Sequence, residues 1–175
     1  KLKILPLSLM LVMTSTFADD VILQNIEIIG GSEKAKTLPG SGHVVSKEQM
    51  EVELTDDINQ VLKTVPGVYV REEDGYGLRP NIGIRGGTSE RSDKITLMED
   101  GVLIAPAPYS NPSAYYFPTI MRMQSIEILK GAPLLKYGPQ TTGGVVNLIS
   151  TPIPATRSGR LSTFLGEDEQ LNTHM

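Results

Sequence analysis

The polar side chains best suited to catalysis are scattered along the chain. The two histidines, His43 and His174, lie far apart, and neither has a carboxylate at the spacing of a metal site. The run Glu72-Glu73-Asp74 could hold a cation, but three adjacent acidic residues more often form a solvated turn. Residues 75–80, Gly-Tyr-Gly-Leu-Arg-Pro, match a phosphate-binding glycine loop poorly, because proline replaces the third glycine. These residues favour neither an enzyme nor a metal centre.

Composition narrows the class of protein further. The formal net charge is −4 and no two basic residues are adjacent, which argues against nucleic acid as a partner. The chain has no cysteine, which is compatible with an oxidising compartment such as the periplasm. Seventeen glycines and twelve prolines indicate many turns, and three phenylalanines without tryptophan indicate a lightly packed core.

The N-terminus has the pattern of a secretory signal peptide. Lys1 and Lys3 precede an apolar run at 4–13, and Thr16-Phe17-Ala18 offers small residues for cleavage before Asp19. An apolar run of about ten residues is too short for a membrane-spanning helix, which needs about 20. A buried core helix is the alternative, but Pro6 argues against it. We expect residues 1–18 to be the signal peptide.

Short helices and short strands follow in irregular order. Ser46 and Gln49 form a capping-box pattern, and Thr55-Asp56-Asp57 caps a second helix. That helix has one apolar face, formed by Ile58, Val61, Leu62 and Val65. Strands are expected at 68–71, 81–85 and 95–99, a turn at Asp100-Gly101, and one more helical turn at 118–123. This mixture predicts an α+β fold with a small mixed sheet.

The most informative stretch is residues 126–149. Alternating Ile126, Ile128 and Lys130 predict one strand, the Gly-Ala-Pro at 131–133 ends it, and the apolar run 145–149 predicts a second. The order of residues resembles the signature that closes the plug domain of TonB-dependent outer-membrane receptors. Earlier motifs of that family occur in the same order, at Pro66-Gly67-Val68, Ile84-Arg85-Gly86 and Asp100-Gly101-Val102.

The resemblance implies a domain organisation. A flexible segment at 19–42 would carry the TonB box at about Ile26-Glu27-Ile28-Ile29, which the partner TonB captures by strand addition. A frayed edge strand is the alternative for this patch. Residues 43–151 would be the plug, and 152–175 a linker with the start of the first barrel strand, at 161–165. Because plugged transporters use about 22 strands, we expect the sequence to be an N-terminal fragment.

The resemblance also implies site residues. Thr96 and Gln140 match substrate contacts of ferric dicitrate receptors, and further cationic or hydroxyl donors for an anionic chelate are Arg79, Arg91 and Tyr109. Surface residues without a ligand are the alternative for each of these five. Arg85 and Lys130 match the arginine pair that contacts glutamates of the barrel wall, although lysine at the second position loses bidentate geometry.

The implied function is TonB-dependent import of a ferric chelate across the outer membrane, with no bond chemistry. The loop 137–140 and the run 105–109 are most similar to ferric dicitrate receptors. The implied partners are TonB with its inner-membrane energising complex and the outer membrane itself. No resident cofactor or metal site is expected, because the ferric chelate is cargo. The alternatives are a receptor for another siderophore or cobalamin, and a free-standing periplasmic or secreted binding module.

Overall fold

The computed structural model describes residues 26–38, 40–53, 57–73, 80–87, 89–104, 117–131, 136–137, 141–165 and 171–174. The expected signal peptide at 1–18 and most of the expected ligand loops lie outside these ranges.

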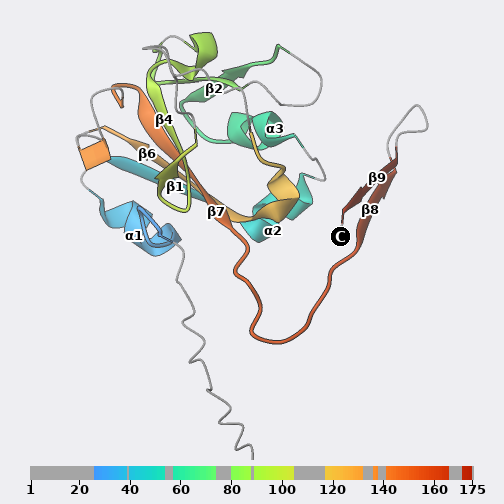
Figure 1. The fold of residues 1–175 in the computed structure, drawn as a ribbon. Helices are drawn as coiled ribbons and strands as arrows, with labels where there is room; N and C mark the ends of the chain where they lie inside the picture. The colour runs from blue at the N-terminus through green and yellow to red at the C-terminus, as the bar shows by residue number, and fades with distance from the viewer. Residues whose placement is uncertain are drawn as a thin grey trace, which may run out of the picture.

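A five-stranded mixed sheet forms the centre of the described chain (Figure 1). Its strands, in spatial order, are β1 (Ser41–Ser46), β6 (Met123–Lys130), β7 (Gly144–Ser150), β4 (Ile95–Glu99) and β5 (Val102–Leu103). β6 is antiparallel to both β1 and β7, whereas β4 runs parallel to β7. The predicted α+β fold with a small mixed sheet is confirmed.

The helices are short, and side chains cap two of them as predicted. The α-helices of the described residues are α1 (Ser32–Thr37), α2 (Lys47–Val52) and α3 (Ile58–Lys63), and the 3-10 turns are η1 (Glu90–Ser92) and η2 (Ile120–Arg122). At α2, the N–H of Gln49 donates to Ser46 Oγ and the N–H of Ser46 donates to Gln49 Oε1. At α3, Asp57 accepts from the N–H of Asn59 at 2.8 Å. Among the described helices, none is long and apolar enough to cross a membrane.

A second, two-stranded sheet pairs β2 (Val68–Arg71) with β3 (Asn81–Ile84). The expected strand at 81–85 ends one residue early, because Arg85 has a φ of 54° and turns the chain. Gly83 is required here, since a Cβ at that position would lie 2.1 Å from the ring of Tyr69. The β4–β5 turn is the predicted one, with positive φ at both Asp100 and Gly101.

Alternate residues of each strand point to opposite faces of the sheet, and buried apolar side chains lie on both faces. One face and the helices α2 and α3 enclose a large cluster, here called the helical core. It includes the predicted apolar face of α3 and residues Ile95, Leu97, Ile126, Ile128, Val146 and Leu148. The other face carries a smaller cluster, here called the N-terminal core, made of Ile29, Met98, Leu129 and Val145.

The described part of the segment expected to be flexible, 19–42, contains a helix and the start of β1. α1 was not predicted, because its residues, Ser-Glu-Lys-Ala-Lys-Thr, show no apolar periodicity. Tertiary contact holds it instead: Ala35 and Leu38 pack against the N-terminal core, and Gly42 leaves room for both. β1 begins at Ser41, two residues before the expected plug boundary.

The C-terminal residues form a separate antiparallel pair, β8 (Ser162–Leu165) and β9 (Leu171–His174). β8 lies within the strand expected at 161–165, whose place in a barrel stays a prediction, and β9 was not predicted. An exposed connection at 151–160 joins β8 to the sheet, and Figure 1 shows the pair apart from it. The Arg160 guanidinium lies 3.1 Å from the Glu51 carboxylate on α2.

Candidate functional site

A buried carboxylate on β6 binds the backbone of residues 26–30, here called the docked segment. Glu127 is only 2% exposed. Its Oε2 accepts from the N–H of Ile28 at 2.6 Å, and its Oε1 accepts from the N–H groups of Ile29 and Gly30 at 3.0 Å each. Hydrogen bonds to an ionised carboxylate are about twice as strong as neutral ones. Three consecutive backbone donors therefore converge on one charged group.

Asn147 connects the docked segment to the rest of the sheet. It lies directly opposite Glu127 across the β6–β7 pair and is fully buried. Its Nδ2 donates to Glu127 Oε2 at 3.1 Å and to the carbonyl of Ile26 at 3.2 Å, and its Oδ1 accepts from the N–H of Gly101. One carboxamide thus joins the segment, the carboxylate and the β4–β5 turn.

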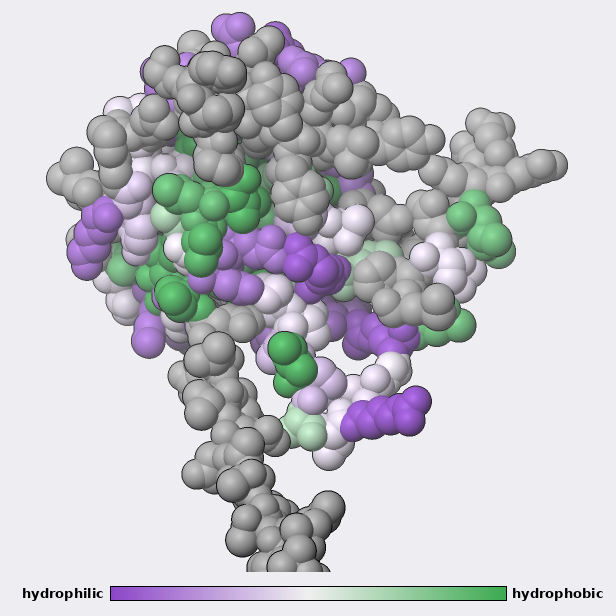
Figure 2. All heavy atoms as spheres, in the orientation of Figure 1, coloured by the Kyte–Doolittle hydropathy of each residue, from purple (hydrophilic) through white to green (hydrophobic). Residues whose placement is uncertain are grey.

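Apolar contacts add to this polar network. Ile29 is 5% exposed and belongs to the N-terminal core, and Ile28 packs against that core. Ile26 is exposed, but it lies so close to Gly101 that a Cβ there would approach it to 2.8 Å. Val102 and Leu103, on β5, are also exposed apolar side chains; Figure 2 shows apolar side chains gathered around the β4–β5 hairpin.

The structure corrects the expected conformation of residues 26–29. They form no strand, so the frayed edge strand is wrong, whereas capture by TonB through strand addition stays a prediction. The reason is local, because three successive N–H groups turn toward one carboxylate instead of alternating between two sides. Sequence reasoning missed Glu127 and Asn147 as site residues. The available signal was a polar residue inside each of two apolar runs, 126–129 and 145–149.

Arg85 and Lys130, expected to act together, do lie together. A Cβ on Gly131, the residue after Lys130, would lie 3.2 Å from the guanidinium of Arg85. Lys130 is buried and donates through Nζ to the carbonyl of Pro66 at 2.6 Å. Burial lowers the pKa of Lys130, and the positive charge of Arg85 lowers it further. Among the described residues, neither cation forms an ion pair.

His43 differs from the expectation of an ordinary surface residue. It lies on β1 opposite Ile128 and is half-buried. Burial lowers the pKa of His43, and the charge of Lys130 lowers it further. On the other face, burial raises the pKa of Tyr137 and the negative charge of Glu127 adds to the effect. The side chain of His174 lies outside the described residues.

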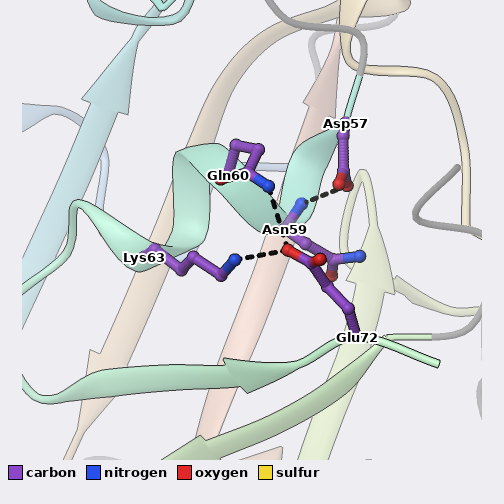
Figure 3. Close-up of polar contacts among 5 residues, drawn as sticks. All are labelled: Asp57, Asn59, Gln60, Lys63 and Glu72. Atoms are coloured by element: carbon purple, nitrogen blue, oxygen red, sulfur yellow. Dashed lines mark hydrogen bonds and ion pairs between the residues drawn. The ribbon is translucent and has the colours of Figure 1, made fainter. Parts of the chain in front are cut away.

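The acidic run considered as a cation site is engaged in ion pairs instead. Figure 3 shows the Glu72 carboxylate facing α3, where it pairs with the ammonium of Lys63 and accepts from the amide of Gln60 at 2.9 Å. Glu73 lies 3.5 Å from Arg71. The Glu72 carboxylate therefore joins the end of β2 to α3, whereas Glu73 contacts only Arg71 of its own strand. Asp74 lies outside the described residues.

The five expected ligand contacts are described only in part. Thr96 lies on β4 and is 7% exposed, so it sits inside the sheet and not in a loop. Arg91 belongs to η1, which Ser92 attaches to the start of β3: its hydroxyl donates to the carbonyl of Pro80 and accepts from the N–H of Ile82. Arg79, Tyr109 and Gln140 lie outside the described residues. The ligand roles remain predictions.

Comparison with known proteins decides the family. The model of the TonB-dependent Receptor Plug Domain matches residues 34–145, more than half of the chain. The chain belongs to this family. Its plug fold explains why distant motifs meet in the structure: the N–H of Arg85 donates to the carbonyl of Gly67, and Lys130 donates to Pro66. Three of the motifs that carried the resemblance thus share one hydrogen-bonded corner.

Relatives of this plug domain include proteins with different named cargoes. The chain is 30% identical over 127 residues to a vitamin B12 transporter, BtuB, of Vibrio vulnificus, covering 73% of the chain and 20% of that protein. The crystal structure of the ferric citrate transporter FecA in the unliganded form is 31% identical, with a TM-score of 0.63, over 70% of this chain and 19% of that one. The siderophore receptor PirA from Acinetobacter baumannii is 27% identical, with a TM-score of 0.53, over 70% and 18%. The chain therefore spans about a fifth of the length of these relatives.

Proposed function

We propose that this plug domain belongs to an outer-membrane receptor that imports a ferric chelate in a TonB-dependent manner. Ferric dicitrate is the leading substrate, and the TonB box lies at Ile26–Ile29. The observation that carries the proposal is the docking of this segment on the plug through hydrogen bonds from its own backbone. A segment that must be handed to a partner needs contacts that can be broken without unfolding the domain.

The proposed transport cycle uses the two ends of the plug differently. The chelate binds at the outer end of the plug, where Thr96, Arg91 and Gln140 contribute donors. Binding there biases the docked segment toward release into the periplasm. TonB then captures the segment by strand addition, and its inner-membrane complex uses the proton-motive force to move part of the plug. No covalent bond of the cargo changes.

The unpaired cations support a plug that sits inside a barrel. Arg85 and Lys130 lie close together without an acidic partner among the described residues, and burial, with the charge of Arg85 added, lowers the pKa of Lys130. Carboxylates on a surrounding wall would satisfy both. The exposed apolar residues Val102 and Leu103 are likewise suited to contact with a wall. A free-standing module would leave Val102 and Leu103 in water and both cations without a counter-ion.

Cobalamin is the second candidate cargo, because relatives named vitamin B12 transporters match the chain about as well as the ferric citrate transporter does. The two cargoes differ in charge, and an anionic ferric chelate gains more from arginine than a cobalamin does.

The test is uptake by cells that carry the complete receptor as their only route for either cargo. We expect radiolabelled iron supplied as ferric dicitrate to accumulate only when TonB is present, and labelled cobalamin to remain outside. Accumulation of cobalamin alone would reverse the order of the two candidates. Iron accumulation that is unaffected by loss of TonB would contradict the proposed energy coupling.

A further inference from the structure

We propose that Glu127 and Asn147 form a latch that keeps residues 26–30 on the plug and must open before TonB can capture them. The inference rests on the proposed function for the identity of the partner. It concerns two residues outside the segment itself, both buried within the sheet.

The latch occupies the backbone groups that strand addition would use. In an extended strand, the N–H and C=O groups of every second residue point to the same side. Residues 26, 28 and 30 would share one such side, and the latch binds a group on each: the carbonyl of Ile26 and the N–H groups of Ile28 and Gly30. The N–H of Ile29, which would point to the opposite side, is also bound to Glu127. The segment therefore cannot be latched and captured at once.

Because the two states exclude each other, the latch lowers the affinity for the partner. The apparent dissociation constant equals the intrinsic value divided by the fraction of receptors whose segment is free. Any change that weakens the bonds to Glu127 raises that fraction and tightens capture. The latch thus acts as an autoinhibitory contact within the domain.

The second half of the latch extends to the β4–β5 turn. Asn147 Oδ1 accepts from the N–H of Gly101, and the neighbouring Asp100 carboxylate accepts from both the N–H and the hydroxyl of Ser150, at the end of β7. β4 begins at Ile95, next to Thr96, and runs parallel to β7 toward this turn. One strand therefore connects an expected ligand contact with a residue that binds the latch.

The test compares Glu127→Gln with Glu99→Gln in the complete receptor. Glu127→Gln keeps the size of the side chain but removes its charge and one acceptor oxygen. Glu99 is a matched control, because it lies on β4 of the same sheet and pairs with Arg122 at 2.6 Å. Its neighbour Met98 belongs to the N-terminal core, so the Glu99 side chain points to the opposite face of the sheet. Hydrogen exchange of the amides at 28–30 reports opening, and titration with the periplasmic domain of TonB reports capture.

We expect Glu127→Gln to speed exchange at 28–30 and to tighten TonB binding, each by about ten- to a hundred-fold, the effect of losing hydrogen bonds to a charged group. Glu99→Gln should stay within about two-fold of the parent, as a surface pair contributes little. Ile29→Ala provides a second variant that leaves the sheet intact, because it removes only an apolar anchor of the segment. It should act in the same direction.

Unchanged exchange in both Glu127→Gln and Ile29→Ala would overturn the latch. Faster exchange with unchanged TonB affinity would overturn its control of capture. If TonB binds neither the parent nor any variant, the proposed partner is wrong, and with it the capture step. In that case exchange at 28–30 still decides whether Glu127 holds the segment.

Discussion

The two faces of the central sheet are covered in different ways. The helical core covers one face with α2, α3 and a large set of buried apolar side chains. The N-terminal core covers the other with a six-residue helix, few apolar residues and the hydrogen bonds to Glu127 and Asn147. Apolar burial over a large area is lost only when the domain unfolds. A cover held by a few polar bonds can leave while the domain stays folded.

The largest expected effect comes from a substitution in the docked segment itself. Ile28→Pro removes the N–H that donates to Glu127 and the same donor that strand addition would use. We expect it to abolish uptake by the complete receptor while ligand binding at the cell surface stays intact. Ile28→Ala keeps the N–H and serves as the control, with uptake retained. Normal uptake by the proline variant would contradict the TonB box assignment.

The helical core is tested by truncating a buried side chain of α3. Leu62 is fully buried in the helical core, so Leu62→Ala should lower the free energy of unfolding by about 2–5 kcal/mol. Val52→Ala on α2 is the control, because Val52 is 78% exposed and its truncation should cost less than about 0.5 kcal/mol. Urea unfolding followed by circular dichroism measures both. The comparison of the two faces predicts that Ile29→Ala lowers the global value by less than Leu62→Ala, because its main effect is local opening.

Substitutions at the expected ligand contacts should have a smaller effect on the function of the receptor. Gln140→Ala and Thr96→Val should each weaken ferric dicitrate binding by the complete receptor about 5- to 150-fold, because a buried acceptor of the chelate loses its donor. Equilibrium binding of the labelled chelate measures both. For Thr96, the effect requires that a hydroxyl on a residue 7% exposed here becomes accessible in the bound state.

Arg91→Ala sharpens that test, because its effect should come from charge and should shrink as salt screens the interaction. If Thr96→Val binds as the parent does while Gln140→Ala fails, the site is confined to the loops. Parent-like binding by all three variants would reject the ferric dicitrate assignment of this end.

The sequence predicts the elements of the helical core better than it predicts α1 and the docked segment. Capping residues and the period of Ile58, Val61 and Leu62 act locally, so α2 and α3 are predictable. α1 depends on the packing of Ala35 and Leu38 against the N-terminal core, and the conformation of the docked segment depends on Glu127, about a hundred residues further along the chain. No local pattern encodes either contact. Arg85 and Lys130 are likewise far apart in the sequence. Their proximity was predicted from the resemblance to the family and does not follow from their spacing.

The smallest predicted effects are those of pH on stability, which act on the two faces of the sheet through different titratable groups. On the helical side, the pKa of His43 is lowered, so the unfolded chain binds a proton more readily than the fold. Stability should therefore fall as the pH drops below about 6.5, the ordinary histidine value. On the N-terminal side, the pKa of Tyr137 is raised, so the unfolded chain loses its proton first. Stability should fall as the pH rises above about 10.

Two substitutions assign these slopes to the faces. His43→Gln should flatten the loss of stability between about pH 6.5 and the lower folded pKa, and Tyr137→Phe should flatten the alkaline loss. Urea unfolding at a series of pH values measures the first. Hydrogen exchange at 28–30 adds a distinction, because Tyr137 packs against the same core as the docked segment. Alkaline pH should therefore open the segment before the domain unfolds, whereas acid acting through His43 should weaken the whole domain together. Segment opening that follows only global unfolding at both extremes would mean that the two covers leave together, and the contrast between the faces would then be wrong.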